Sequence, residues 1–182
     1  MYLISAYFDE NTNKILKHLQ QRISDKTGND FMIRNNVMPH LTISAIEARN
    51  IDVLIPEFEK VCRGKLQPLE EKSVANNTIN IVSVGQLFPR VIYAAPVLNE
   101  YMMNLSISIY NEFATIPETN ISKFYQPYSW MPHITLGKCL DKEQMRQAFA
   151  VLQDLFMPID GRITKIGLST VNPYREVMSV VL

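Results

Sequence analysis

The chain has 182 residues, of which 47% are hydrophobic, so it is long enough to bury a sizeable core. Its 18 basic and 18 acidic residues give a formal net charge of zero at pH 7. This balance argues against a surface that coats long nucleic acid, because such binding strengthens with the number of phosphates that the protein neutralises. It leaves room for a local positive pocket that recognises a nucleotide or an RNA end.

The ends and the cysteines suggest an intracellular protein. The first apolar run is short and is followed by Asp9 and Glu10, and it lacks the basic segment of a signal peptide. No stretch approaches the roughly 18 apolar residues that a membrane span needs. Cys62 and Cys139 lie far apart and outside any CxxC motif, so we expect free or buried thiols. We therefore expect a cytoplasmic protein without a membrane segment, and a monomer by default.

The first half of the chain predicts a strand, a helix, a strand, a helix and two strands. For the first helix, Thr12 is a candidate N-cap and Gly28 suits the position just after the last turn. Pro56 weakens the prediction for the middle of the second helix. The predicted elements are 2–8, 12–27, 37–46, 50–63, 65–75 and 78–85, with a turn near 76–77.

The second half predicts nearly the same order. Asp141 is a candidate N-cap for the last helix, with Glu143 in its first turn. The predicted elements are a strand at 90–95, a helix at 97–114, a loop at 117–122, a strand at 128–138, a helix at 141–155, and a hairpin of 162–171 with 174–182. The matching order indicates a single domain (1–182) built by duplication of an α+β unit, with pseudo-repeat halves at about 1–88 and 89–182 and a cleft between them.

Two short motifs carry the chemistry. Met38-Pro39-His40-Leu41-Thr42 and Met131-Pro132-His133-Ile134-Thr135 are identical at four of five positions, and they contain two of the three histidines. Given the frequencies of Met, Pro and Thr in this chain, such a match around a second histidine has a chance probability on the order of 10⁻⁴. Duplication explains the match, but it does not explain why the polar residues are kept in both copies.

The spacing places each imidazole beside a hydroxyl. Side chains alternate along a strand, so His40 and Thr42 share one face, and His133 and Thr135 do the same in the second copy. If the halves are related by a pseudo-two-fold axis, the two polar faces meet. One neutral imidazole can then accept a proton while the other, protonated, donates one, since both forms exist near neutral pH. The threonine hydroxyls can donate hydrogen bonds to phosphoryl oxygens.

The paired His-x-Thr motifs resemble those of the two-histidine phosphoesterase superfamily, which includes 2′-5′ RNA ligase-like proteins and cyclic phosphodiesterases. The resemblance covers essentially the whole chain. It implies an α+β, bilobal fold in which antiparallel sheets flank a central cleft and helices cover the outer faces. It also implies opening of 2′,3′-cyclic phosphates, or cleavage and joining of 2′-5′ linkages, in nucleotides or RNA ends, without a metal or other cofactor. His40 and His133 become the acid–base pair, and Thr42 and Thr135 the phosphate donors.

Further residues are candidates for substrate binding. Tyr93 lies where the family's second half begins its first strand, and its ring could stack on a base for about 1–3 kcal/mol. Tyr128 and Trp130, just before the second motif, are also candidates for stacking. For these three rings, packing is the alternative. Lys138 could bind phosphate, or it could be a solvated charge at a strand edge.

The motifs also allow other interpretations. The histidines could be hydrogen-bonded core residues and the threonines simply strand formers. A zinc site on the two histidines lacks further ligands at metal spacing. A nucleotide- or RNA-binding module without turnover could use the same cleft, but binding alone would tolerate loss of one imidazole. His18 is expected to be an ordinary surface residue.

Overall fold

The structure is a computed structural model that describes residues 1–64, 77–171 and 174–182. The strand predicted at 65–75 and the turn predicted at 172–173 lie outside the described residues. Within them, the α+β class and the antiparallel strand pairing are confirmed. The two cysteines are both free, as the sequence predicts, with Cys62 buried and Cys139 partly exposed.

Helices begin and end where side chains or glycine satisfy the free backbone groups. The first helix starts earlier than predicted, because Asp9 and not Thr12 is its N-cap, and it ends at Gly28 in the left-handed conformation as predicted. Pro56 falls in the first turn of its helix, where a missing N–H costs nothing. Asp141 caps the last helix as predicted. The described helices are α1 (Glu10–Thr27), α2 (Phe31–Arg34), α3 (Ile55–Gly64), α4 (Glu100–Phe113) and α5 (Lys142–Leu155), with 3₁₀ turns at Ile51–Val53 and Lys123–Tyr125.

The strands of the described residues join into one antiparallel sheet in the order β1-β2-β6-β4-β3-β7-β8. Because β7 also pairs with β1, the hydrogen-bonded path returns on itself, and β5 is attached to the side of β2. The two sheets expected from the sequence are therefore continuous with each other. The strands are β1 (Tyr2–Phe8), β2 (Leu41–Ala48), β3 (Thr78–Leu87), β4 (Val91–Pro96), β5 (Thr119–Ile121), β6 (Ile134–Lys138), β7 (Ile159–Val171) and β8 (Tyr174–Val181).

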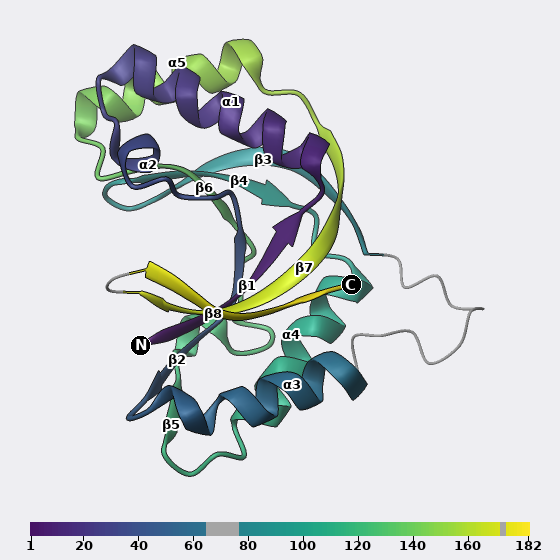
Figure 1. Ribbon diagram of the computed structural model, residues 1–182. Coiled ribbons are helices and arrows are strands. Elements are labelled where there is room, and N and C mark those ends of the chain that lie inside the picture. The colour runs from purple at the N-terminus through teal and green to yellow at the C-terminus, as the bar shows by residue number, and fades with distance from the viewer. Residues whose placement is uncertain (65–76, 172–173) are drawn as a thin grey trace.

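Two helix pairs cover the outside of the sheet (Figure 1). Helix α1 packs against α5, and α3 packs against α4, with the strands between the two pairs. Each pair combines one helix from before residue 88 with one from after it. The two lobes of the fold are thus not the two halves of the sequence, because each half supplies one long helix to each lobe.

The strand predictions differ from the structure most clearly at the two motifs and at β5. Both motif strands begin later than predicted, at Leu41 and Ile134, because the preceding proline has no N–H to continue a ladder. The segment predicted as a loop at 117–122 contains β5, whose three residues pair with the end of β2. Leu41 and Ile134 are fully buried, so the apolar face of each motif lies in the core as predicted.

Candidate active site

The two motifs meet through one pair of residues. Leu41 of β2 lies opposite Ile134 of β6, and the strands run antiparallel. These two residues are the equivalent positions of the two motifs, so a pseudo-two-fold axis passes between them. Since antiparallel order reverses the neighbours on either side of the pair, His40 lies toward Thr135 and Thr42 lies toward His133. The sheet therefore brings the two His-x-Thr motifs together around a fully buried apolar pair.

The same irregularity follows the threonine in both motifs. The register of β2 with β1 skips one residue after Thr42, so Ile43 is the extra residue of a β-bulge. The register of β6 with β4 skips one residue after Thr135, so Leu136 is the extra residue there. A bulge increases the local twist and redirects the strand. The two motif strands are thus bent alike, at matching positions.

A buried side chain satisfies the carbonyl of each threonine. The indole N–H of Trp130 donates to the carbonyl oxygen of Thr42 at 3.0 Å. The side-chain amide of Gln20, from α1, donates to the carbonyl oxygen of Thr135 at 3.1 Å. Both donors are buried, with exposed fractions of 6% and 3%. Because a bulge disrupts the ladder locally, these bonds supply the partners that buried carbonyls require.

Each imidazole is fixed by the backbone of its own motif. The Nδ1 atom of His40 lies 2.7 Å from the carbonyl oxygen of Met38, and that of His133 lies 2.9 Å from the carbonyl oxygen of Met131. A carbonyl oxygen only accepts, so each Nδ1 carries the hydrogen. In the neutral ring the lone pair is then on Nε2, which can accept a proton, and in the charged ring Nε2 can donate one.

Positive groups surround His40. Burial lowers the pKa of His40 from its ordinary value of 6.5, and the charges of His133 and Lys138 lower it further, against the hydrogen bond to Met38, which raises it. His40 is half-buried, and the charges of His133 and Lys138 lie close enough to act on it. The arrangement disfavours an additional proton on His40 and favours a bound anion.

An aromatic ring lies beside each histidine. The ring centroid of Tyr93 is 5.7 Å from that of His133, in an edge-on arrangement. The ring centroid of Tyr7, on β1, is 6.2 Å from that of His40. Tyr93 is a candidate from the sequence alone, whereas Tyr7 and Gln20 are not. The only sequence signal for Tyr7 was its place at the end of a predicted strand, which does not reveal that this strand borders β2.

The remaining predicted residues fall into different surroundings. Lys138 is exposed at the end of β6, with its Nζ atom 5.8 Å from the ring centroid of Phe31. Tyr128 is 85% exposed and has a positive φ of 66°. Trp130 is buried and donates to the backbone, so its ring is not available to stack on a base. Its predicted role in substrate binding is therefore replaced by a structural one. His18 is exposed on α1, as predicted.

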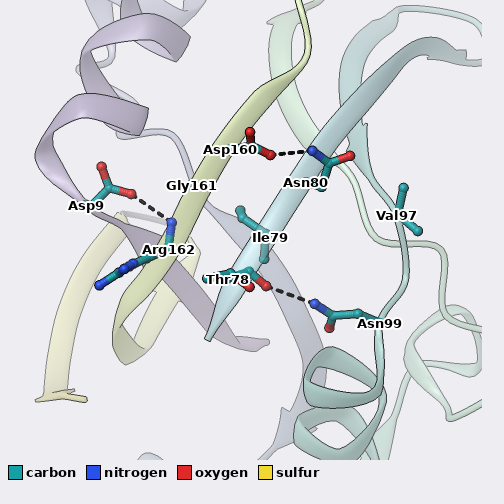
Figure 2. Close-up of a pocket in the computed structure, with 9 residues that line it drawn as sticks. All are labelled: Asp9, Thr78, Ile79, Asn80, Val97, Asn99, Asp160, Gly161 and Arg162. Atoms are coloured by element: carbon teal, nitrogen blue, oxygen red, sulfur yellow. Dashed lines mark hydrogen bonds between the residues drawn. The ribbon is translucent and has the colours of Figure 1, made fainter. Parts of the chain in front are cut away.

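A cavity of about 830 Å³ is lined by residues of β3 and β7, by the N-cap of α1 and by the segment before α4 (Figure 2). Several of its polar side chains form hydrogen bonds that stabilise the fold. Asp9 caps α1 and accepts from the backbone N–H of Arg162. Asn99 donates to the carbonyl oxygen of Thr78. Asp160 of β7 accepts a hydrogen bond from the side chain of Asn80, which lies opposite it on the neighbouring strand β3. None of the residues predicted for the site lines this cavity.

Within the described residues, no group of three or more His, Cys, Asp and Glu side chains is placed to hold a metal ion. In the same residues, no helix has the length and apolar character needed to cross a membrane.

Comparison with known proteins agrees with the geometry. The family model of the 2′-5′ RNA ligase superfamily matches residues 8–172, which includes both motifs and every described helix. A search of curated proteins finds no match. The matched span, with its two His-x-Thr motifs, places the chain in the 2′-5′ RNA ligase superfamily, which is the two-histidine phosphoesterase superfamily.

Proposed function

We propose that this protein is a metal-independent phosphodiesterase that opens 2′,3′-cyclic phosphates, or cleaves or joins 2′-5′ linkages, in nucleotides or RNA ends. The observation that carries the proposal is the antiparallel pairing at Leu41 and Ile134, which sets two backbone-fixed imidazoles on either side of one axis. The cytoplasmic location and the monomeric state stay predictions from the sequence.

In the hydrolytic direction, a water oxygen attacks phosphorus, and the bond from phosphorus to the 2′ or 3′ oxygen breaks. The Nε2 atom of one neutral histidine takes the proton from the water. The Nε2–H of the other, charged histidine gives a proton to the leaving oxygen. The two histidines exchange protonation states, and the product is a nucleotide monoester. General acid–base help of this kind contributes roughly 10²- to 10⁴-fold per group.

The surroundings favour His40 as the base in this direction. Burial and the neighbouring positive charges lower its pKa, so it is neutral at pH 7 and ready to accept a proton. His133 then acts as the acid. Once a substrate phosphate is bound, its negative charge offsets the mutual repulsion of the two imidazoles and Lys138.

Other side chains bind the substrate in this proposal. The hydroxyls of Thr42 and Thr135 donate to the phosphoryl oxygens as charge develops on them. Lys138 attracts the anionic phosphate. The half-buried ring of Tyr93 and the exposed ring of Tyr128 are the candidates for stacking on a base.

The test is turnover of the four nucleoside 2′,3′-cyclic monophosphates in the presence of EDTA. Wild type is compared with His40→Ala and His133→Ala, and with His18→Ala as the matched control, because His18 is an exposed histidine outside the motifs. We expect activity in wild type and in His18→Ala and its loss in both motif variants. The preferred base and the product isomer would then define the substrate.

Two other outcomes would overturn the proposal. Activity that disappears after chelation and returns with added metal would contradict the two-histidine mechanism. Tight binding of nucleotides or short 2′-5′-linked RNA by wild type, without any product after long incubation, would favour a binding module that uses the same face of the sheet.

A further inference from the structure

Three residues of β7 and β8 lie next to the side chain of Tyr7. Its hydroxyl lies 2.6 Å from the hydroxyl of Tyr174. The ammonium group of Lys165 lies 4.5 Å from the centre of the ring, and Glu176 fixes that ammonium by an ion pair of 2.8 Å. Gly167 provides the space, because a Cβ there would stand 3.0 Å from the ring. These contacts come from side chains on two strands and define one position for the ring.

The ring in turn borders His40. Tyr7 is only 6% exposed, and its centroid lies 6.2 Å from that of the imidazole. It therefore occupies space that water would otherwise fill on this side of His40. The charged groups that act on His40 are His133, just before β6, and Lys138, at the end of β6. Desolvation is the largest of the causes that lower the pKa of His40, and the buried ring of Tyr7 lies beside the imidazole.

The pseudo-symmetry of the sheet does not account for this ring. Ala6 pairs with Leu41, and Ala94 pairs with Ile134, so these two alanines are equivalent. Tyr7 follows the first alanine, and the equivalent position in the second half is Ala95. Tyr93 precedes the second alanine. In each half an aromatic ring lies beside the histidine, but the two tyrosines occupy different positions relative to the equivalent alanines. Duplication of one ancestral unit does not by itself explain this difference.

We propose that Tyr7 is a positioning residue for His40, and that the β7–β8 hairpin holds its ring in place. The inference rests on the proposed function and assigns part of that site to the carboxy-terminal hairpin. Tyr7 does not touch the reacting atoms in this proposal. It keeps the imidazole in one orientation and keeps water away from one side of it, so that His40 is neutral when substrate arrives.

The test is an NMR titration of the histidine ring protons, which does not depend on turnover, together with kcat, KM and the pH profile. Tyr7→Ala removes the ring, and Tyr93→Ala is the matched control at the other histidine. We expect the pKa of His40 to rise toward 6.5 in Tyr7→Ala and to stay at the wild-type value in Tyr93→Ala. In Tyr7→Ala we also expect kcat to fall by about tenfold or more, with KM changed less than twofold.

Tyr7→Phe keeps the ring, so the pKa of His40 in this variant should equal the wild-type value. Tyr174→Phe removes the same contact between the two hydroxyls from the other side, and the side chain of Tyr174 is largely exposed. The double variant with both Phe substitutions should therefore lose no more kcat than either single variant. An unchanged His40 titration in a folded Tyr7→Ala protein would overturn the proposal. If Tyr7→Ala does not fold, the Phe variants decide: a changed His40 titration in Tyr7→Phe, or losses of kcat in the two single variants that sum in the double variant, would overturn the proposal. If wild type turns over no substrate, the titration still decides the positioning role separately.

Discussion

The bond from Gln20 to the carbonyl of Thr135 gives a sharp prediction for stability. Gln20→Leu replaces the amide with an apolar side chain of similar size and leaves the Thr135 carbonyl without its donor. Gln20 is 3% exposed, so water cannot easily replace that donor. An unsatisfied buried group costs about 1–3 kcal/mol, and the added apolar burial of leucine offsets part of this. We expect a net loss of about 1–2 kcal/mol in the free energy of unfolding.

For a chain of this size, each 1 kcal/mol corresponds to about 2–4 °C in Tm, so Tm should fall by about 2–8 °C. The matched control is Gln21→Leu, one residue along the same helix. Gln21 is exposed, and its amide bonds only to Asp25 in the next turn, so we expect a change within about 0.5 kcal/mol. Urea unfolding followed by far-UV circular dichroism gives both values. Equal stability of the two variants, with equal m-values, would refute the role of the bond.

The other predictions concern the same site and its supports. Trp130→Phe should cost about 1–3 kcal/mol of unfolding free energy, measured by urea denaturation, because Thr42 loses the indole donor to its carbonyl. Thr135→Val should lower kcat by about 10²-fold in the cyclic phosphate assay, because one hydroxyl donor is lost while the shape is kept. The acidic limb of the kcat/KM profile should lie below pH 6.5, because the base, His40, has a lowered pKa and stays deprotonated to lower pH. At Asp9, burial raises the pKa, but hydrogen bonds from Thr12 and from backbone N–H groups outweigh it, so the pKa is lowered. The charge of Asp9 therefore stabilises the fold above the unfolded-state pKa of about 4, and this stabilisation is lost as the pH falls through the folded pKa. In Asp9→Asn, the midpoint of urea unfolding should depend less on pH below pH 4 than it does in wild type.

Much of the fold followed from local patterns. Apolar spacing and caps located the long helices, and alternation located most of the strands. The errors have local causes too. Alternation in the motifs extends through the proline, which hides the fact that the ladder starts only at Leu41 and Ile134. Strand β5 has three residues and forms by pairing with β2, far away in the sequence, so its own residues carry no signal.

The candidate site was predictable only where it repeats. Two copies of His-x-Thr stand out against chance, whereas a single Gln or Tyr does not. Gln20 belongs to the buried side of α1, and nothing in its helix indicates a bond to a strand 115 residues away. Trp130 was read as a possible stacking residue because its position beside the motif was visible while its burial was not. The duplication at about residue 88 stays a prediction, which the matching bulges after Thr42 and Thr135 support.

Symmetry alone would give this site two equivalent histidines, whereas the proposed mechanism assigns them different roles, His40 as the base and His133 as the acid. The motif, the bulge and the bond to the carbonyl two residues before are the same in both copies, so none of them distinguishes His40 from His133. The difference has to come from outside the repeat. The ring of Tyr7, next to the β7–β8 hairpin, lies beside His40, and the charge of Lys138, which has no counterpart after the first motif, lowers the pKa of His40. In the proposed mechanism, Tyr7 and Lys138 therefore make the surroundings of His40 differ from those of His133. This difference would make His40 the residue that accepts the proton and His133 the residue that donates one.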